Sequence, residues 1–548
     1  MTEADVVDIA RRIHTRDVSL WPAAPEEQLI IGKRLGWLDA PDWLKKNREE
    51  LTTWARDIYG QEFARVVVLG MGGSSLAARA LAGVFGKTEQ GLPLVVLDTT
   101  HPAAVTAAAA GLSETLFVSA SKSGTTAEVT ALTAYFYQQV KAERGRAAGE
   151  NFVAITDVGS ALQHYAEAHD FRRCFLNPAD VGGRFSMLTA FGMVPAALLG
   201  LDLDRMFNSA RAARVASEAD TPDADQSALR LGQAMARSAL AGRNKLTLLL
   251  SPQLGAFSAW VEQLIAESTG KSGIGIIPVI DESLPIGAYG MDRFFVAVTL
   301  TGDHTLDETL QALEAAGHEI DHHQLDDRYD LAGEFFRWEF AVAVAGALLA
   351  VNPFDEPDVV SSKQTTRRLL EGNKEEQANS IGEIRDDAGL TLRMPISLVD
   401  EDAGLSGQLL RFFQNSSPTN YLTLMPFLYM TDDVQNALSE LITALRAVLP
   451  LPVILNPGPR YLHSTGQLHK GGPNSGLYLI ITASTDTMLP IPGEPYSFSD
   501  LNNAQASGDF LSLVALGRQV AHLDLGALTQ QALAAVTAEV QLRWTESA

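Results

Sequence analysis

The sequence of 548 residues contains a single cysteine, Cys174, which excludes an internal disulfide and suits a reducing compartment. It also lacks an excess of basic residues, since 42 lysines and arginines face 66 aspartates and glutamates, for a net charge of −24. This balance repels nucleic acid, and no dense basic run offsets it. We therefore expect no nucleic-acid partner, and any anion that binds must be small and held by local donors.

Long apolar runs are also missing. The longest is FAVAVAGALLAV, from Phe340 to Val351, which is too short for a bilayer and predicts a buried helix. The N-terminal stretch MTEADVVDIARRIHTRD is charged and has no apolar signal-peptide core. With 46% hydrophobic and 20% charged residues, the composition is typical of a soluble globular protein. We expect a cytoplasmic protein with no membrane partner.

Apolar runs rich in Val and Leu alternate with helix-like segments along the chain. They read RVVVLG, LPLVVLD, TLFVSAS and NFVAIT between about 65 and 156, and NKLTLLLS, FFVAVTL, NYLTLMPFLY, LPVILNPG and GLYLIIT later. This alternation predicts an α/β fold of parallel sheets covered on both faces, and the length exceeds that of one core. We predict a helical N-terminal arm (1–45), a first domain (46–210), a second domain with an insertion (211–500) and a C-terminal tail (501–548).

A glycine-rich turn follows the first predicted strand, in VVVLGMGGSSLAARAL. Gly72 and Gly73 permit tight turning, and Ser74 or Ser75 stands where a helix N-cap belongs. One alternative is a dinucleotide site of a nicotinamide dehydrogenase, with Asp98 as the ribose ligand. That fingerprint is incomplete, because Ser75 occupies its third glycine position.

A second polar turn follows a later strand, in LFVSASKSGTTAEVT. Thr125 and Glu128 have the spacing of a capping box, which predicts a well-capped helix. The cap leaves further hydroxyls and a cation unexplained, namely Ser121, Lys122, Ser123 and Thr126. Helix N-termini bind phosphate, and two strand-loop-helix units converge at the carboxyl edge of a parallel sheet. One phosphomonoester shared by both turns explains these residues better than a dinucleotide does.

The motifs GMGGSS, SKSGTT and VGGRFSMLTAFG together resemble the sugar isomerase (SIS) domains of the glucose-6-phosphate isomerase family. The resemblance continues through VEQLIAESTGKSG, FFRWEFAVAVAGALLAVNPFDEPDV and GPRYLHSTGQLHKGGP, and is nearest to the isomerase half of bifunctional transaldolase/phosphoglucose isomerases. It implies two SIS domains, each an α-β-α sandwich around a mostly parallel sheet. The implied reaction interconverts glucose 6-phosphate and fructose 6-phosphate through an enediol, without metal or cofactor.

The resemblance also implies roles for single residues. Glu267 matches the proton-transfer base, and its place at a helix C-terminus favours a raised pKa. Arg184 matches the cation that stabilises the enediolate, and Gln263 matches a substrate-binding glutamine. The implied phosphate-binding positions are Gly73, Ser74, Ser121, Lys122, Ser123 and Thr126.

His463 resembles the family's ring-opening histidine, which the neighbouring subunit contributes, so the resemblance implies a homodimer with a shared active site. His469 lies six residues later and is equally well explained as structural. Relatives carry a lysine that assists ring opening in a C-terminal helix. The comparable stretch here, FSDLNNAQASGDFLSLVALGRQ, has none, which leaves Lys470 as a candidate replacement.

Two further alternatives follow from the sequence. The cluster DHHQLDDRYD, from Asp321 to Asp330, mixes histidines and carboxylates, but we interpret it as a solvated turn rather than a metal site. The chain could also be a non-catalytic sugar-phosphate-binding regulator built on SIS domains. Such a regulator would keep both phosphate loops but would not need Glu267, Arg184 and His463 together.

Overall fold

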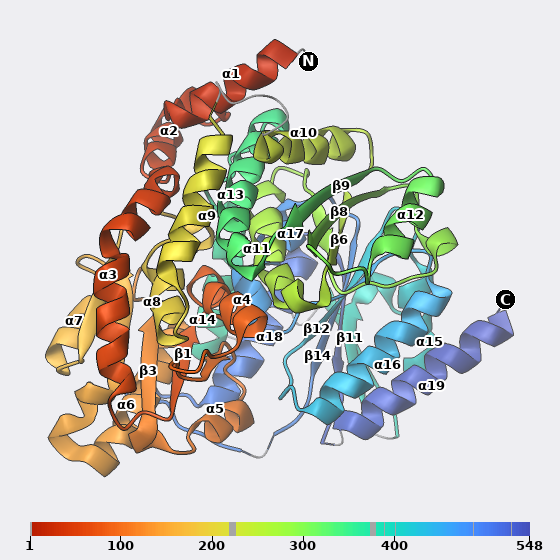
Figure 1. Cartoon of the computed structure of the whole chain (residues 1–548). Coiled ribbons are helices and arrows are strands. Elements are labelled where there is room, and N and C mark those ends of the chain that lie inside the picture. The colour runs from red at the N-terminus through yellow and green to blue at the C-terminus, as the bar shows by residue number, and fades with distance from the viewer. Residues whose placement is uncertain are drawn as a thin grey trace. The chain divides into compact units, whose positions relative to one another are not determined.

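The computed structural model of the chain describes residues 3–218, 226–372, 380–387, 389–400, 402–485, 487–527 and 529–547. These residues form an α/β fold of parallel sheets flanked by helices, so the predicted fold class is confirmed (Figure 1). The chain divides into two compact units. Unit 1 comprises Met1–Asp98, Ala108–Asp281 and Met291–Glu356, and unit 2 comprises Thr99–Ala107, Glu282–Gly290 and Pro357–Ala548.

The first sheet of unit 1 has five parallel strands in the order β2-β1-β3-β4-β5. The strands are β1 (Arg65–Gly70), β2 (Leu94–Leu97), β3 (Thr115–Ala120), β4 (Phe152–Asp157) and β5 (Arg173–Asn177). The strand order reverses between β1 and β3, and ligands of open α/β sheets bind at the carboxyl ends of strands beside such a reversal. The two polar turns of the sequence follow these two strands.

Helices cover both faces of this sheet because its strands alternate side chains between two apolar layers. On one face, Phe117 of β3 stacks on Phe136 of α6 (Ala127–Arg144), with ring centroids 4.8 Å apart. On the other face, Leu116 and Val118 join the large core cluster that also contains α4 (Leu76–Phe85) and α8 (Ala190–Leu198). The sheet is therefore rigidly supported from both sides.

The second sheet of unit 1 has four parallel strands in the order β7-β6-β8-β9. They are β6 (Lys245–Leu250), β7 (Ile277–Val279), β8 (Arg293–Leu300) and β9 (Ile320–Leu325). The remaining helices of the unit are α1 (Glu3–His14), α2 (Pro25–Gly32), α3 (Ala40–Tyr59), α7 (Ala161–Ala168), α9 (Leu203–Ala216), α10 (Ser227–Leu240), α11 (Ser258–Thr269), α12 (Asp307–Ala315) and α13 (Leu331–Leu348).

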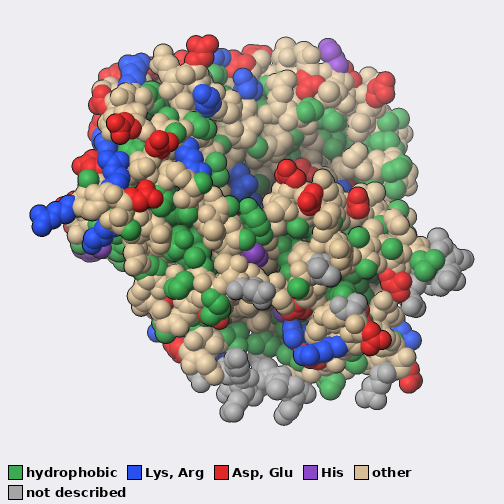
Figure 2. Space-filling view, turned by 90° about the horizontal axis from the view of Figure 1, so that it is seen from below, with side chains coloured by type: hydrophobic (Ala, Val, Ile, Leu, Met, Phe, Trp, Pro, Cys, Tyr) green, Lys and Arg blue, Asp and Glu red, His purple; other side chains and the backbone are tan. Residues whose placement is uncertain are grey.

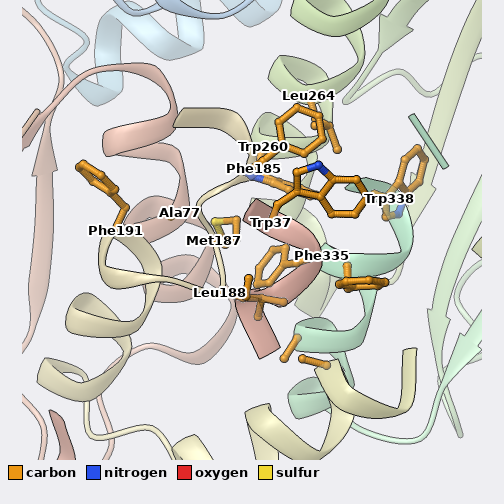
Figure 3. Close-up of a cluster of buried hydrophobic side chains, with 14 of the residues drawn as sticks. Trp37, Ala77, Phe185, Met187, Leu188, Phe191, Trp260, Leu264, Phe335 and Trp338 are labelled. Atoms are coloured by element: carbon orange, nitrogen blue, oxygen red, sulfur yellow. The ribbon is translucent and has the colours of Figure 1, made fainter. Parts of the chain in front are cut away.

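An aromatic core joins the helices of unit 1 (Figure 3). Trp260 of α11 packs edge-on against Phe335 of α13, with centroids 5.0 Å apart, and Trp37 packs against Phe185 at 5.6 Å. Phe340 and its neighbours up to Ala345 are buried in α13, which confirms the buried helix expected there. The core thus supports the loop that carries Phe185 and, beside it, Arg184.

Unit 2 contains a six-stranded sheet in the order β10-β11-β15-β14-β12-β13, in which β11 pairs antiparallel with both its neighbours. The strands are β10 (Ile381–Arg385), β11 (Thr391–Pro395), β12 (Tyr421–Pro426), β13 (Val453–Leu455), β14 (Gly476–Thr482) and β15 (Gln519–Asp524). The helices are α5 (Pro102–Ala108), α14 (Val360–Leu370), α15 (Leu405–Gln414), α16 (Asp432–Val448), α17 (Gly466–Gly471), α18 (Phe498–Ala515) and α19 (Thr529–Ser547).

The strands assigned to one second domain from the sequence lie in two separate sheets, since β6 and β8 belong to unit 1 while β12 to β14 belong to unit 2. The segment expected as a C-terminal tail supplies β15, which lies inside the six-stranded sheet between β11 and β14. Strands β10 and β11 pair antiparallel and extend the same sheet. The predicted domain boundaries stay a prediction.

Surface charge fits the composition. The face in Figure 2 carries both acidic and basic side chains, scattered among hydrophobic and uncharged ones. None of the helices formed by the described residues combines the length and apolar character needed to cross a bilayer.

Candidate active site

The turn after β1 touches the turn that carries Arg184. Gly72 has φ +52°, a conformation that glycine adopts without strain. A Cβ on Gly73 would lie 2.3 Å from the carbonyl carbon of Gly183, so only glycine permits this approach. Ser74 ends the short 3₁₀ turn Gly72–Ser74 and is half-buried. The GMGGSS and VGGRFS turns therefore pack directly against each other through their backbones.

The turn after β3 is tied together by its own hydroxyls. The Oγ of buried Ser121 accepts from the backbone N–H of Gly124 at 3.1 Å and lies 3.1 Å from the Oγ1 of Thr126. Ser123 and Thr125 form a second hydroxyl pair at 2.9 Å. The predicted capping box is wrong, because α6 begins at Ala127, its N-cap is Thr126, and that residue makes no side-chain cap hydrogen bond.

Lys122 reaches across the carboxyl edge of the sheet. Its Nζ forms an ion pair with Asp157 at the end of β4 and donates to the carbonyl of Ala179 at 3.0 Å. Burial raises the pKa of Asp157, and the ammonium group of Lys122 opposes that rise. Lys122 is thus fixed at the edge where the strands end, with Asp157 as its present partner.

Arg184 is buried and fully engaged within unit 1. Its Nε donates to Ser268 at 2.8 Å, and its Nη2 donates to the carbonyls of Pro353 at 2.7 Å and Asp355 at 2.9 Å. Its Nη1 donates to Glu356 Oε2 at 3.0 Å. Because guanidinium nitrogens stay charged, this places a fixed positive charge in a buried site.

Glu267 lies in the last turn of α11, and its Oε2 is 3.5 Å from Arg184 Nη1. Gln263, one turn earlier, donates its Nε2 to the same oxygen at 3.0 Å. Burial raises the pKa of the Glu267 carboxyl above its ordinary value, Arg184 opposes the rise, and the charge of Glu356 adds to it. The raised pKa expected from the sequence is present, but burial rather than the helix terminus is its main cause.

Three charged residues beside this pair were not predicted from the sequence. Lys271 is buried, and its Nζ lies 2.9 Å from Asp355 Oδ1. Burial, together with the charge of Arg184, lowers the pKa of Lys271 to about 8. Although burial acts to raise it, the pKa of Glu356 is held below its ordinary value by the Arg184 guanidinium. Lys271 lies in the motif ESTGK, and Asp355 and Glu356 lie in NPFDEP. These motifs are roughly 80 residues apart, so no local pattern in the sequence relates them.

His463 ends the 3₁₀ turn Arg460–His463 of unit 2 and is half-buried. His469 is fully buried between Tyr461 and Tyr478, with ring centroids 5.6 Å and 4.9 Å away. Burial lowers the pKa of His469 to about 3, so the ring is neutral at physiological pH. Its surroundings are those of a structural histidine.

Lys470 is also buried, and its Nζ lies 2.6 Å from Asp509 Oδ1. Tyr461 donates its hydroxyl to the other oxygen of Asp509 at 2.7 Å, and Ser362 donates to the first oxygen at 3.0 Å. The ammonium group of Lys470 is thus committed to a buried network. This argues against Lys470 as a replacement for the ring-opening lysine.

Two stretches considered as alternative sites in the sequence analysis make other contacts in the structure. Asp98, the candidate ribose ligand, accepts two bonds from Arg79 Nη2, at 2.9 Å and 3.0 Å. The interpretation of DHHQLDDRYD as a turn is wrong for its first half, which forms β9. There His323 lies 2.5 Å from Glu334 of α13. Within the described ranges, no three side chains of His, Cys, Asp or Glu gather as metal ligands.

With this geometry established, comparisons with known proteins decide the family. The sequence model described as Phosphoglucose isomerase matches residues 42–276, which include both turns, Arg184 and Glu267. A glucose-6-phosphate isomerase of Symbiobacterium thermophilum is 31% identical over 393 residues, covering 61% of this chain and 86% of that protein. The chain belongs to the phosphoglucose isomerase family. A Streptococcus pneumoniae relative of this family, also named glucose-6-phosphate isomerase, is 28% identical, with 61% of this chain and 86% of its own length covered.

Solved structures agree on the fold. A hypothetical protein from Thermus thermophilus superposes with a TM-score of 0.58 and 25% identity, covering 67% of this chain and 94% of that chain. A glucose-6-phosphate isomerase from Chlamydia trachomatis superposes with a TM-score of 0.50 and 19% identity, covering 61% and 75%. The resemblance to bifunctional transaldolase/phosphoglucose isomerases stays a prediction.

Proposed function

We propose that this member of the phosphoglucose isomerase family interconverts glucose 6-phosphate and fructose 6-phosphate. The observation that carries the proposal is the buried Glu267 carboxyl, with its raised pKa, 3.5 Å from the buried guanidinium of Arg184. A base with a pKa closer to neutrality and an adjacent fixed cation are what proton transfer through an enediolate requires. A non-catalytic regulator would have no use for this pair.

In the proposed mechanism, Glu267 removes the proton from one of the two adjacent substrate carbons and returns it to the other, while the hydroxyl proton of the enediol passes between the two substrate oxygens. Arg184 stabilises the negative charge that develops on the enediolate oxygen. Gln263 orients Glu267 through the bond from its Nε2 and contacts substrate beside it. Each of these groups comes from a buried element, so the reacting geometry is fixed before substrate arrives.

The substrate phosphate is proposed to bind between the turns that follow β1 and β3. Gly73 and Ser74 supply the first turn, and Ser121, Lys122, Ser123 and Thr126 supply the second. The N-terminus of α6, without a side-chain cap, adds backbone N–H donors. Phosphate would share Lys122 with Asp157, so part of the ion pair in the free protein would be exchanged for the ligand.

His463 is the proposed acid/base for opening the sugar ring. Among the described residues, unit 2 holds two lysines, Lys363 and Lys470, and Lys470 is committed to Asp509. Lys363 lies on α14, and its side chain is exposed. We therefore propose Lys363 as the lysine that assists His463.

A pair of variants separates these two lysines. Lys363→Met should lower turnover at least tenfold, in line with the roughly 10²–10⁴-fold range of acid–base groups, while the melting temperature stays unchanged. Lys470→Met should instead destabilise the fold by about 3–5 kcal/mol, because Asp509 is left buried without its cation. Turnover and thermal unfolding measure both effects, and full turnover in Lys363→Met would refute its role.

A homodimer in which the partner contributes the ring-opening histidine, and a cytoplasmic location, complete the proposal. The direct test of function is conversion of fructose 6-phosphate to glucose 6-phosphate by purified protein, with and without EDTA. We expect turnover that EDTA leaves unchanged. Absence of turnover in both conditions would contradict the proposed function.

A further inference from the structure

Two carboxylates share one nitrogen of Arg184. Nη1 lies 3.0 Å from Glu356 Oε2 and 3.5 Å from Glu267 Oε2. Glu267 comes from α11, whereas Glu356 comes from the segment after α13. The side chain of Glu356 is 38% exposed, against 11% for Glu267. The two carboxylates therefore compete for the same guanidinium charge, and Glu356 keeps more contact with solvent than Glu267 does.

Geometry decides which carboxylate holds the negative charge. Glu356 has the shorter, hydrogen-bonded contact with Arg184 and loses less hydration, so ionisation costs less there. Arg34 and Lys271 also act on Glu356 with positive charge. The pKa directions agree with the geometry, because that of Glu356 is lowered and that of Glu267 is raised. Groups whose environments separate their pKa values divide into a fixed ion and a proton carrier.

We propose, resting on the proposed isomerase function, that Glu356 is a positioning residue that holds Arg184 and keeps Glu267 a stronger base. Without Glu356, Arg184 would act on Glu267 alone, and the carboxylate would be stabilised as an ion and weakened as a base. The charged and polar groups that face Glu267 are Arg184, Lys271, Glu356 and Gln263. Lys271 is itself bound by Asp355, which leaves Glu356 as the carboxylate that opposes Arg184 at Glu267.

The competition also suits the reaction. If Arg184 were paired with Glu267 alone, this ion pair would have to break each time negative charge developed on the substrate. With Glu356 as a permanent partner, the guanidinium keeps its position while Glu267 gains and loses its proton. The positive charge is then in place for the enediolate without reorganisation, which is the condition for efficient electrostatic stabilisation.

The test is Glu356→Gln, which keeps size and removes charge. The acid limb of the pH profile of kcat/KM should move to lower pH by about one unit, because the base becomes easier to ionise. Glu356→Asp, which keeps the charge, should restore most of the wild-type profile. Glu319 is the matched control, since it also binds arginines, Arg237 and Arg243, and its side chain is 33% exposed. Glu319→Gln should leave the profile in place.

Titration of the glutamate carboxyl carbons by NMR separates this inference from the proposed function. The Glu267 signal is assigned by its loss in Glu267→Gln, and its pKa is read without substrate. A lower Glu267 pKa in Glu356→Gln, or in Glu356→Ala should the first variant fail to fold, supports the inference. An unchanged pKa overturns it, whatever the activity. A shifted pKa in a protein that isomerises no sugar phosphate supports the coupling and overturns only the proposed function.

Discussion

At Glu267, a single side chain combines burial, a nearby cation and a nearby anion. Glu267→Gln keeps its shape and can still accept the bond from Gln263 through its carbonyl oxygen. It cannot take a proton at neutral pH. We expect kcat to fall by at least the roughly 10²–10⁴-fold typical of a lost general base, with little change in KM, because the two turns proposed to bind phosphate are untouched.

Hydrogen exchange between solvent and the substrate carbon next to the carbonyl reports the same step without turnover. This exchange should disappear along with turnover in Glu267→Gln. Near-normal kcat in this variant would show that another group abstracts the proton.

The proximity of several candidate site residues agrees with the sequence analysis, while their roles stay predictions. Glu267, Gln263 and Arg184 lie together as the resemblance implied. Lys271 and Glu356 were missed because they approach Glu267 and Arg184 only through the packing of α11, the VGGRFS turn and the segment after α13. Such contacts depend on tertiary packing, which no local pattern encodes. The capping box failed because Thr125 bonds to Ser123 instead.

At the scale of elements, the close approach of two turns should limit substitution. Gly73→Ala would place a methyl group 2.3 Å from the Gly183 carbonyl carbon, so the two turns must separate. We expect a loss of about 1–3 kcal/mol in unfolding free energy, as for other overpacked sites. Gly183→Ala is the control on the facing turn, because its added Cβ would meet nothing within 4 Å.

Denaturant unfolding of both variants checks this prediction. Gly183→Ala should stay close to wild type in stability. Equal stability of both variants would mean that the two turns can separate without a loss of unfolding free energy.

The strands differ in whether a local sequence pattern is enough to predict them. Strands β1 to β4 of the first sheet were predicted because each is a continuous apolar run followed by a turn, whereas the edge strand β5, with two arginines before its short apolar stretch, was not. The position of β15 between β11 and β14 was not predicted, since pairing between strands far apart in the chain leaves no periodic trace in either segment. The pairing of β10 with β11 was missed because both strands have five residues and neither is a continuous apolar run.

At the scale of the whole molecule, helix α13 links stability to pH through two glutamates of opposite behaviour. Glu339 is fully buried, and within the described residues neither carboxyl oxygen has a hydrogen-bond partner. Burial raises its pKa well above the ordinary value. The folded state therefore retains a proton that the unfolded state releases, and stability falls as pH rises above the ordinary carboxyl range.

Glu339→Gln should remove this dependence. Relative to wild type, the variant should gain stability between about pH 5 and pH 8, by at most about 1.4 kcal/mol for each pH unit. Melting temperatures at both pH values measure the gain. Parallel pH dependence in both proteins would show that Glu339 does not retain its proton in the folded state.

Glu334, five residues earlier on α13, is the internal comparison. Its carboxylate contacts Arg337 and His323, and although burial acts to raise the pKa, the Arg337 guanidinium and the contact with His323 lower it to about 2. Its contribution is present above the ordinary carboxyl pKa and is lost as pH falls toward 2. Glu334→Gln should therefore cost about 3–5 kcal/mol at neutral pH, the cost of breaking a buried pair.

The buried hydroxyl of Thr100 lies 2.8 Å from Gln505 Oε1 and 3.1 Å from Asn502 Oδ1, both in unit 2. These partners are separated from Thr100 by 405 and 402 positions in the chain. A ribosome adding about 5–20 residues per second needs roughly 20–80 s to bridge that interval. During that interval the Thr99–Ala107 segment has been synthesised, but α18, which carries Asn502 and Gln505, has not. During synthesis, unit 2 therefore reaches its final structure last, and a nascent chain stalled before α18 would expose this segment to chaperones and proteases.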